Sequence, residues 1–156
     1  MPHDPRQIVN TAASFFLAAD RSLEQRSLGP GQFQMLIVPA IVCRVFSIEL
    51  YFKAIVTLEG GSATGHKLDE LYAQLSPNSQ TAIRTRASLS EAELHQKLGE
   101  VSKAFVEWRY IFESQSANID PTFLYNIAHA AKVEAETLLA KAAASDAPQG
   151  SGTSGG

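Results

Sequence analysis

The sequence predicts an all-α protein: an antiparallel up-and-down bundle of five to six helices with a disordered C-terminal tail. Apolar residues recur at helical spacing along most of the 156 residues. Capping residues precede several of these segments, often with a proline directly after the cap. No segment shows the sustained apolar and polar alternation that indicates a strand. Short connections between the segments favour antiparallel neighbours.

Two long helices are expected in the first half of the chain. Asp4 followed by Pro5 is an N-terminal signal for the first helix. Its apolar face is expected to comprise Ile8, Ala12, Phe15, Phe16, Ala19 and Leu23. The Leu-Gly-Pro-Gly turn at 28–31 ends it. The second helix should run from about 32 to 58, with Pro39 as a kink or as its effective start. Because this segment is apolar nearly all round, it predicts a central, buried helix.

The second half of the chain is expected to hold four further helices. They span about 66–75, 77–87, 91–113 and 121–143. Ser90 and Glu93 form a capping box, and Asp120 followed by Pro121 caps the last helix. The third of these helices carries an apolar seam with heptad spacing, made by Leu94, Leu98, Val101, Phe105, Trp108 and Phe112.

Chain length and composition predict one domain over residues 1–144 and a flexible tail over 145–156. From Asp146 the chain is rich in Gly, Ser and Pro, a composition typical of disordered tails and linkers. The net charge of −3 argues against a global basic field for nucleic acid. A single cysteine, Cys43, and no visible secretory signal lead us to expect a cytoplasmic protein. The longest apolar run, 35–43, is far shorter than the roughly 20 residues of a membrane span.

Charged residues inside apolar helices are the most informative feature, because buried charge costs free energy unless it is paired. Glu49 and Lys53 are four residues apart and share a helix face. One interpretation is an ion pair at the rim of the bundle. The other is a positioned polar group that faces a cleft.

A row of polar residues runs beside the apolar seam. His95, Ser102 and Arg109 are spaced by seven, and Glu113 lies one turn beyond Arg109. These residues form either a solvated edge or a functional row in which Arg109 reaches inward to a carboxylate. Glu49 is the candidate, because the planar guanidinium fork matches a carboxylate at two points.

His66 opens a short helix after a Gly-rich loop. At a helix N-terminus we expect it to be neutral, or paired with Asp69 or Glu70. Two roles are open to it: a hydrogen bond that holds the loop, or catalysis. The loop departs from the phosphate-loop pattern, and His95 lacks a second histidine at metal-ligand spacing. The sequence therefore predicts neither a cofactor nor a metal.

Three segments together resemble the HEPN domain superfamily. They are SIELYFKAI at 47–55, GHKLDELY at 65–72 and WRYIFE at 108–113. The resemblance implies a small helical bundle, often a homodimer, in a bacterial defence or toxin–antitoxin type system. It implies a nucleotide, a nucleic acid or a protein as partner, with no membrane. The expected ligand-binding residues are Glu49, Lys53, His66, Arg109 and Glu113.

The ribonuclease members of that superfamily carry an arginine, four to six residues, and then a histidine. None of the arginines of this chain has a histidine five to seven places further on. The sequence therefore predicts a non-catalytic binding and interaction module. One alternative is a divergent ribonuclease that uses His66 or His95 with Arg109. The other is a structural helical adaptor without a small-molecule site.

Overall fold

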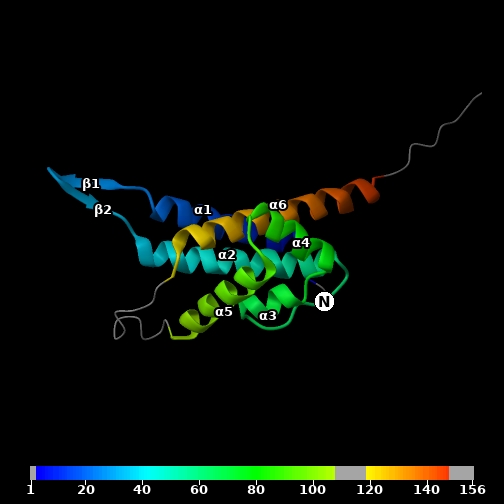
Figure 1. Ribbon diagram of the computed structural model, residues 1–156. Helices are drawn as coiled ribbons and strands as arrows, with labels where there is room; N and C mark the ends of the chain where they lie inside the picture. Colours follow the sequence, from blue (N-terminus) through cyan, green and yellow to red (C-terminus); the bar gives the residue numbers. More distant parts are fainter. Residues whose placement is uncertain (1–2, 108–118, 148–156) are drawn as a thin grey trace, which may run out of the picture.

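The computed structural model describes residues 3–107 and 119–147, and this part of the chain is a helical bundle with one small sheet (Figure 1). Its helices are α1 (Pro5–Ser22), α2 (Ile37–Leu58), α3 (Leu68–Ala73), α4 (Pro77–Arg86), α5 (Glu91–Glu107) and α6 (Pro121–Ser145). Its strands are β1 (Arg26–Gly29) and β2 (Gln32–Gln34). The predicted all-α fold class is confirmed. The predicted tail falls mostly on residues 148–156, outside the described residues.

The four long helices alternate in direction (Figure 1). Helices α1 and α6 pack against α2 and against each other, and α3 packs between α2 and α5. Short helix α4 packs on α6. Among the residues that the structure describes, the up-and-down order α1, α2, α5, α6 is therefore interrupted only by α3 and α4. None of the described helices is long and apolar enough to cross a membrane.

Helix α2 is the central helix, as its apolar sequence predicts. Its middle turns are buried, and its largest fully buried side chains are Ile48, Tyr51, Phe52 and Ile55. The helix begins at Ile37, which puts Pro39 in the first turn, where a missing backbone N–H removes no helical hydrogen bond. Of the two expectations for Pro39, the effective helix start is confirmed.

A β-hairpin replaces the helical start that we expected at residues 32–36. Strands β1 and β2 pair antiparallel, with Ser27 opposite Phe33. Gly31 has a φ of +72°, which allows the tight reversal between the strands. The prediction of helix at 32–36, and of no strand, was wrong because strands of three and four residues are too short to show alternation. The hairpin projects from one end of the bundle (Figure 1).

The predicted helix caps are present. The Asp4 carboxylate accepts a hydrogen bond from the Arg6 N–H at 2.9 Å. Ser90 and Glu93 make the reciprocal bonds of a capping box, with the Ser90 N–H donating to Glu93 at 2.9 Å. Asp120 accepts from the first backbone N–H groups of α6. Each cap satisfies donors that a helix leaves free at its start.

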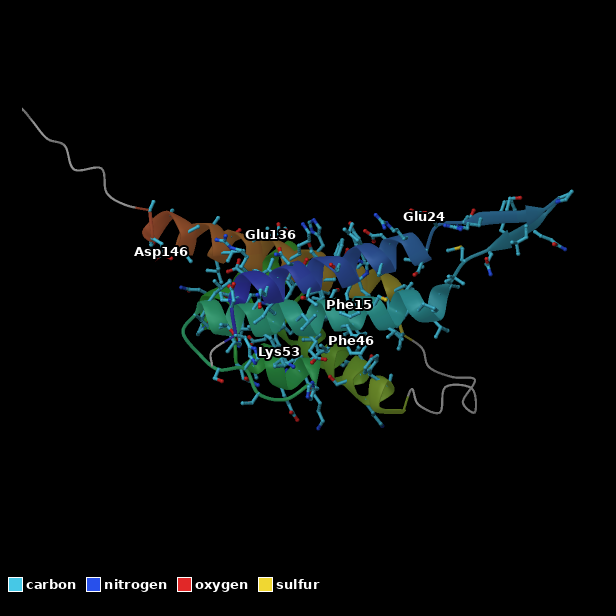
Figure 2. The ribbon with its side chains drawn as sticks, turned by 180° about the vertical axis from the view of Figure 1, so that it is seen from behind. Phe15, Glu24, Phe46, Lys53, Glu136 and Asp146 are labelled. Atoms are coloured by element: carbon cyan, nitrogen blue, oxygen red, sulfur yellow. The ribbon has the colours of Figure 1, made fainter. Side chains whose placement is uncertain are left out.

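Aromatic rings join α1, α2 and α5. The Phe46 ring lies 5.5 Å from that of Phe15 and 5.7 Å from that of Phe105, in an edge-on arrangement with the latter. Figure 2 shows Phe15 and Phe46 where α1 and α2 meet. Phe105 extends the predicted seam, in which Leu94, Leu98 and Val101 are buried. The two remaining seam positions, Trp108 and Phe112, lie outside the described residues.

Tyr51 brings a hydroxyl group into the centre of the bundle. Its side chain is fully buried, and its hydroxyl has no hydrogen-bond partner in the described part of the chain. Burial raises the pKa of this hydroxyl far above its ordinary value, and the charge of Glu136 raises it further.

A buried carboxylate ties α4 to α6. The Glu134 side chain is almost fully buried and accepts hydrogen bonds from the Ser79 hydroxyl at 3.1 Å and the Arg86 guanidinium at 2.7 Å. A buried carboxylate without such donors would carry an uncompensated desolvation cost. This pairing therefore fixes the position of α4 on α6.

Replacing Arg86 by alanine is expected to lower the free energy of unfolding by about 2 kcal/mol, because Glu134 then stays buried with one donor fewer. Urea denaturation measures this change. Arg84→Ala is the matched control in the same helix. Arg84 reaches the exposed Glu91 only at 3.5 Å, so its loss should cost less than about 0.5 kcal/mol. Equal losses in the two variants would contradict the assignment.

Candidate functional site

Three of the five predicted site residues meet at one point. The same carboxylate oxygen of Glu49, Oε1, accepts from Lys53 Nζ at 2.7 Å and from His66 Nδ1 at 2.8 Å. Glu49 and Lys53 lie one turn apart on α2, and His66 lies in the loop before α3. Figure 2 shows the position of Lys53 on α2. We call these three residues the Glu49 cluster.

The protonation pattern of His66 follows from its neighbours. Nδ1 faces a carboxylate oxygen, so Nδ1 must carry a proton, because two lone pairs at 2.8 Å would repel each other. The 3.3 Å approach of Lys53 Nζ to Nδ1 then places two donors on one shared acceptor. In the neutral ring, Nε2 is left with a lone pair. The side chain is 84% exposed, so this edge of the ring faces solvent.

Burial differs sharply within the Glu49 cluster. The Glu49 side chain is only 10% exposed, while Lys53 is partly exposed and His66 largely exposed. A buried carboxylate thus holds two nitrogen-bearing groups at the surface. An ammonium group has three donors, and Glu49 takes one of those of Lys53. The cluster can therefore donate hydrogen bonds to an anion or, through His66 Nε2, accept a proton.

The loop that carries His66 is held by side-chain amides and carboxylates. The Gln74 side chain donates to the Thr64 carbonyl at 2.8 Å and accepts from the Thr64 N–H at 3.0 Å. The Ser76 N–H donates to the Glu59 carboxylate at 2.7 Å, joining the two ends of the segment. These bonds fix the loop so that His66 meets α2.

Four other residues were predicted from the sequence either to line the site or to pair with His66. Arg109 and Glu113 lie outside the described residues, so the expected pairing of Arg109 with Glu49 stays a prediction. Of the two expectations for His66, the pairing with Asp69 or Glu70 was wrong, because the ring contacts Glu49 instead. Asp69 accepts from the Ser102 hydroxyl, and Glu70 pairs with Lys67. The reason is geometric: His66 precedes α3, so its ring turns back to α2 rather than along its own helix.

His95, the other candidate of the ribonuclease reading, is separate from the Glu49 cluster. It lines a surface hollow with Tyr72 and Glu91. Within residues 3–107 and 119–147, no group of three or more His, Cys, Asp or Glu side chains is placed to hold a metal ion.

Ser102 has a structural role that the sequence did not reveal. Its hydroxyl accepts from the Leu68 N–H at 3.1 Å and donates to the Asp69 carboxylate at 3.0 Å. The N-cap residue of α3, Lys67, offers no side-chain acceptor, so Ser102 of α5 takes over this function. Its spacing of seven from His95 and Arg109 marked a shared face but gave no sign of a cap.

An apolar cleft lies at the end of the bundle from which the hairpin projects. It has a volume of about 160 Å³ and is lined by Leu23, Met35, Ile37, Ala40, Ile41, Arg44, Pro121, Leu124 and Tyr125. The buried Arg44 donates to the Phe16 carbonyl at 3.3 Å and to the Asp20 carboxylate. Its guanidinium carbon lies 4.4 Å from the Phe16 ring and 5.1 Å from the Tyr125 ring. All these contacts come from within the bundle, and they hold α1, α2 and α6 together at this end.

No family model, curated protein or solved structure matches this chain. The resemblance to the HEPN superfamily therefore stays a prediction from its motifs.

Replacing Ser102 by alanine is expected to lower the free energy of unfolding by about 1 kcal/mol, because α3 loses its cap from α5. The amide of Leu68 should also exchange with solvent faster, which hydrogen exchange measures. Lys103→Ala is the control on the same helix, since Lys103 is exposed and should change neither quantity. Protection of Leu68 that survives Ser102→Ala would contradict the cap.

Proposed function

We propose that this protein is a non-catalytic, HEPN-like binding module whose ligand carries a phosphate or another anionic group. The observation that carries the proposal is the Glu49 cluster, in which one buried carboxylate holds Lys53 and His66 at the surface. The cytoplasmic location and the link to a bacterial defence or toxin–antitoxin type system, both expected from the sequence, belong to the same proposal.

The chemistry of the cluster favours an anionic ligand. Lys53 has donors left after its bond to Glu49, and His66 presents its outer ring edge to solvent. Both groups are already held in place, so a ligand would lose little free energy in ordering them. A nucleotide or a short nucleic acid supplies phosphate oxygens that accept from the Lys53 ammonium group, and from His66 Nε2 once the ring has taken up a second proton. The missing arginine-to-histidine spacing supports binding without catalysis.

The binding proposal is tested by thermal unfolding with and without ATP, GTP or a short RNA oligonucleotide. A ligand at 100 times its dissociation constant stabilises the folded state by about 2.7 kcal/mol, which raises Tm by several degrees. We expect such a rise for the wild-type protein. His66→Ala and Lys53→Met should each reduce it, because the first removes the imidazole ring and the second removes the ammonium donors that face the phosphate.

Lys132→Met is the matched control. Lys132 also forms a one-turn ion pair, with Glu136 on α6, but it lies outside the Glu49 cluster. This variant should keep the full ligand-induced rise in Tm. A wild-type protein that none of these phosphate ligands stabilises would contradict the proposal and favour the structural adaptor.

A second candidate function is the divergent ribonuclease, and one observation favours it. The Glu49 carboxylate holds His66 Nδ1, which directs the basic Nε2 to solvent, as a general base requires. In this reading His66 takes the proton of a ribose hydroxyl, and Arg109 remains its proposed partner for the phosphate.

The ribonuclease reading predicts that the purified protein cleaves mixed RNA and that His66→Ala abolishes the cleavage. Product is measured on denaturing gels. His129→Ala is the control, because His129 is also exposed but stacks on Tyr125 of α6, away from the Glu49 cluster. Cleavage no greater than in buffer, or equal cleavage by the wild type and His66→Ala, would eliminate this function.

A further inference from the structure

The hairpin end of the molecule carries most of the exposed large apolar side chains of the described residues. Six of the nine large apolar side chains that are exposed in the described part of the chain fall between residues 28 and 38. These six are Leu28, Phe33, Met35, Leu36, Ile37 and Val38, each 40–67% exposed. We call them the hairpin patch. Single exposed apolar residues are normal, whereas six of them within residues 28–38 are typical of an interaction site.

The bundle leaves the strands of the hairpin almost entirely uncovered. All its residues except Gly29 are exposed (Figure 2). Two strands alone are marginally stable in water, and the outer edge of each strand offers unpaired backbone groups. A partner that packs on the hairpin would cover both the apolar side chains and these edges.

The apolar cleft supplies a receptor of matching size. Its volume is about 160 Å³, and a dry apolar cavity of about 150 Å³ in another protein holds a benzene molecule. The cleft can therefore take one phenyl ring. Phe33, the most exposed side chain of the hairpin patch, carries such a ring. The cleft on the same molecule includes Met35, which lies two residues after Phe33 in the chain.

We propose that the occupant of this surface is a second copy of the same chain, with the Phe33 ring of each copy seated in the apolar cleft of the other. Ring and cleft lie side by side on one molecule, so a single two-fold axis brings both pairs together at once. Two hairpins that pack antiparallel place the tip of each near the base of the other. The proposal rests on the hairpin end alone and is independent of the ligand of the Glu49 cluster.

The exposed area is sufficient for such a dimer. A large apolar residue presents on the order of 150–200 Å² when fully exposed. With 40–67% of each side chain uncovered, the hairpin patch leaves roughly 500–600 Å² per copy. Stable interfaces bury about 600–1,000 Å² per partner, and the polar hairpin atoms beside the patch supply the remainder.

The test is sedimentation equilibrium of the full chain over a range of concentrations. We expect a dimer for the wild type. Phe33→Ser, which removes the ring, and Ile37→Lys, which places a charge on the cleft wall, should each weaken the dimer at least tenfold. Both residues are exposed, so the variants should keep the wild-type circular dichroism. Leu17→Ser is the matched control, an exposed apolar residue of α1 outside the hairpin patch, and should leave the dimer unchanged.

Mixing the two variants tests the exchange itself. In each variant homodimer both ring-to-cleft contacts are damaged. A mixed dimer keeps one intact contact, because the Ile37→Lys copy supplies a normal ring to the normal cleft of the Phe33→Ser copy. The mixture should therefore dimerise more tightly than either variant alone. A monomeric wild type, including one that binds a different protein through this surface, would overturn the proposal. So would a dimer insensitive to Phe33→Ser or a mixture that dimerises no better than its components.

Discussion

Burial of α2 is the constraint on which the rest of the structure depends, because a charge on a surrounded helix must find a partner. Arg44 reaches Asp20 and the Phe16 carbonyl on α1. Glu49 accepts from Lys53 of its own helix and from His66 of the following loop. Each contact outside α2 fixes another segment against the central helix. The charged residues of α2 therefore help to position α1 and the loop before α3. Within α2 itself, Glu49 and Lys53 form an ion pair.

The same pairings place two surfaces on the molecule. Arg44 and Glu49 are five residues apart, so their side chains leave α2 about 140° apart around the helix axis. Arg44 packs between α1 and α6 beside the apolar cleft, whereas Glu49 faces the loop before α3. One surface is an apolar cleft, and the other is polar and presents hydrogen-bond donors. The two proposed contacts, with a second copy of the chain and with an anionic ligand, therefore use different faces of the central helix.

Local signals made most of the fold predictable from the sequence. Caps such as Ser90 with Glu93 act over one turn, and periodicity along a helix reports its buried face, so helix positions were readable. The hairpin was missed because its strands are too short for a periodic signal. Within the site, the Glu49–Lys53 pair follows from helix spacing, whereas the contact of His66 with Glu49 spans 17 residues and depends on the loop path. Ser102 capping a helix 34 residues earlier is likewise a tertiary contact with no local signature.

The buried hydroxyl of Tyr51 gives the folded state an upper limit in pH. A tyrosine in the unfolded chain loses its proton near pH 10, while burial keeps the native group protonated beyond that value. Above pH 10 the unfolded chain thus binds fewer protons than the native one, and the free energy of unfolding falls as pH rises. Below pH 10 this contribution to stability is fully present. Loss of the Tyr51 proton therefore destabilises the centre of the bundle at alkaline pH, because no hydrogen-bond donor among the described residues is placed to stabilise the phenolate.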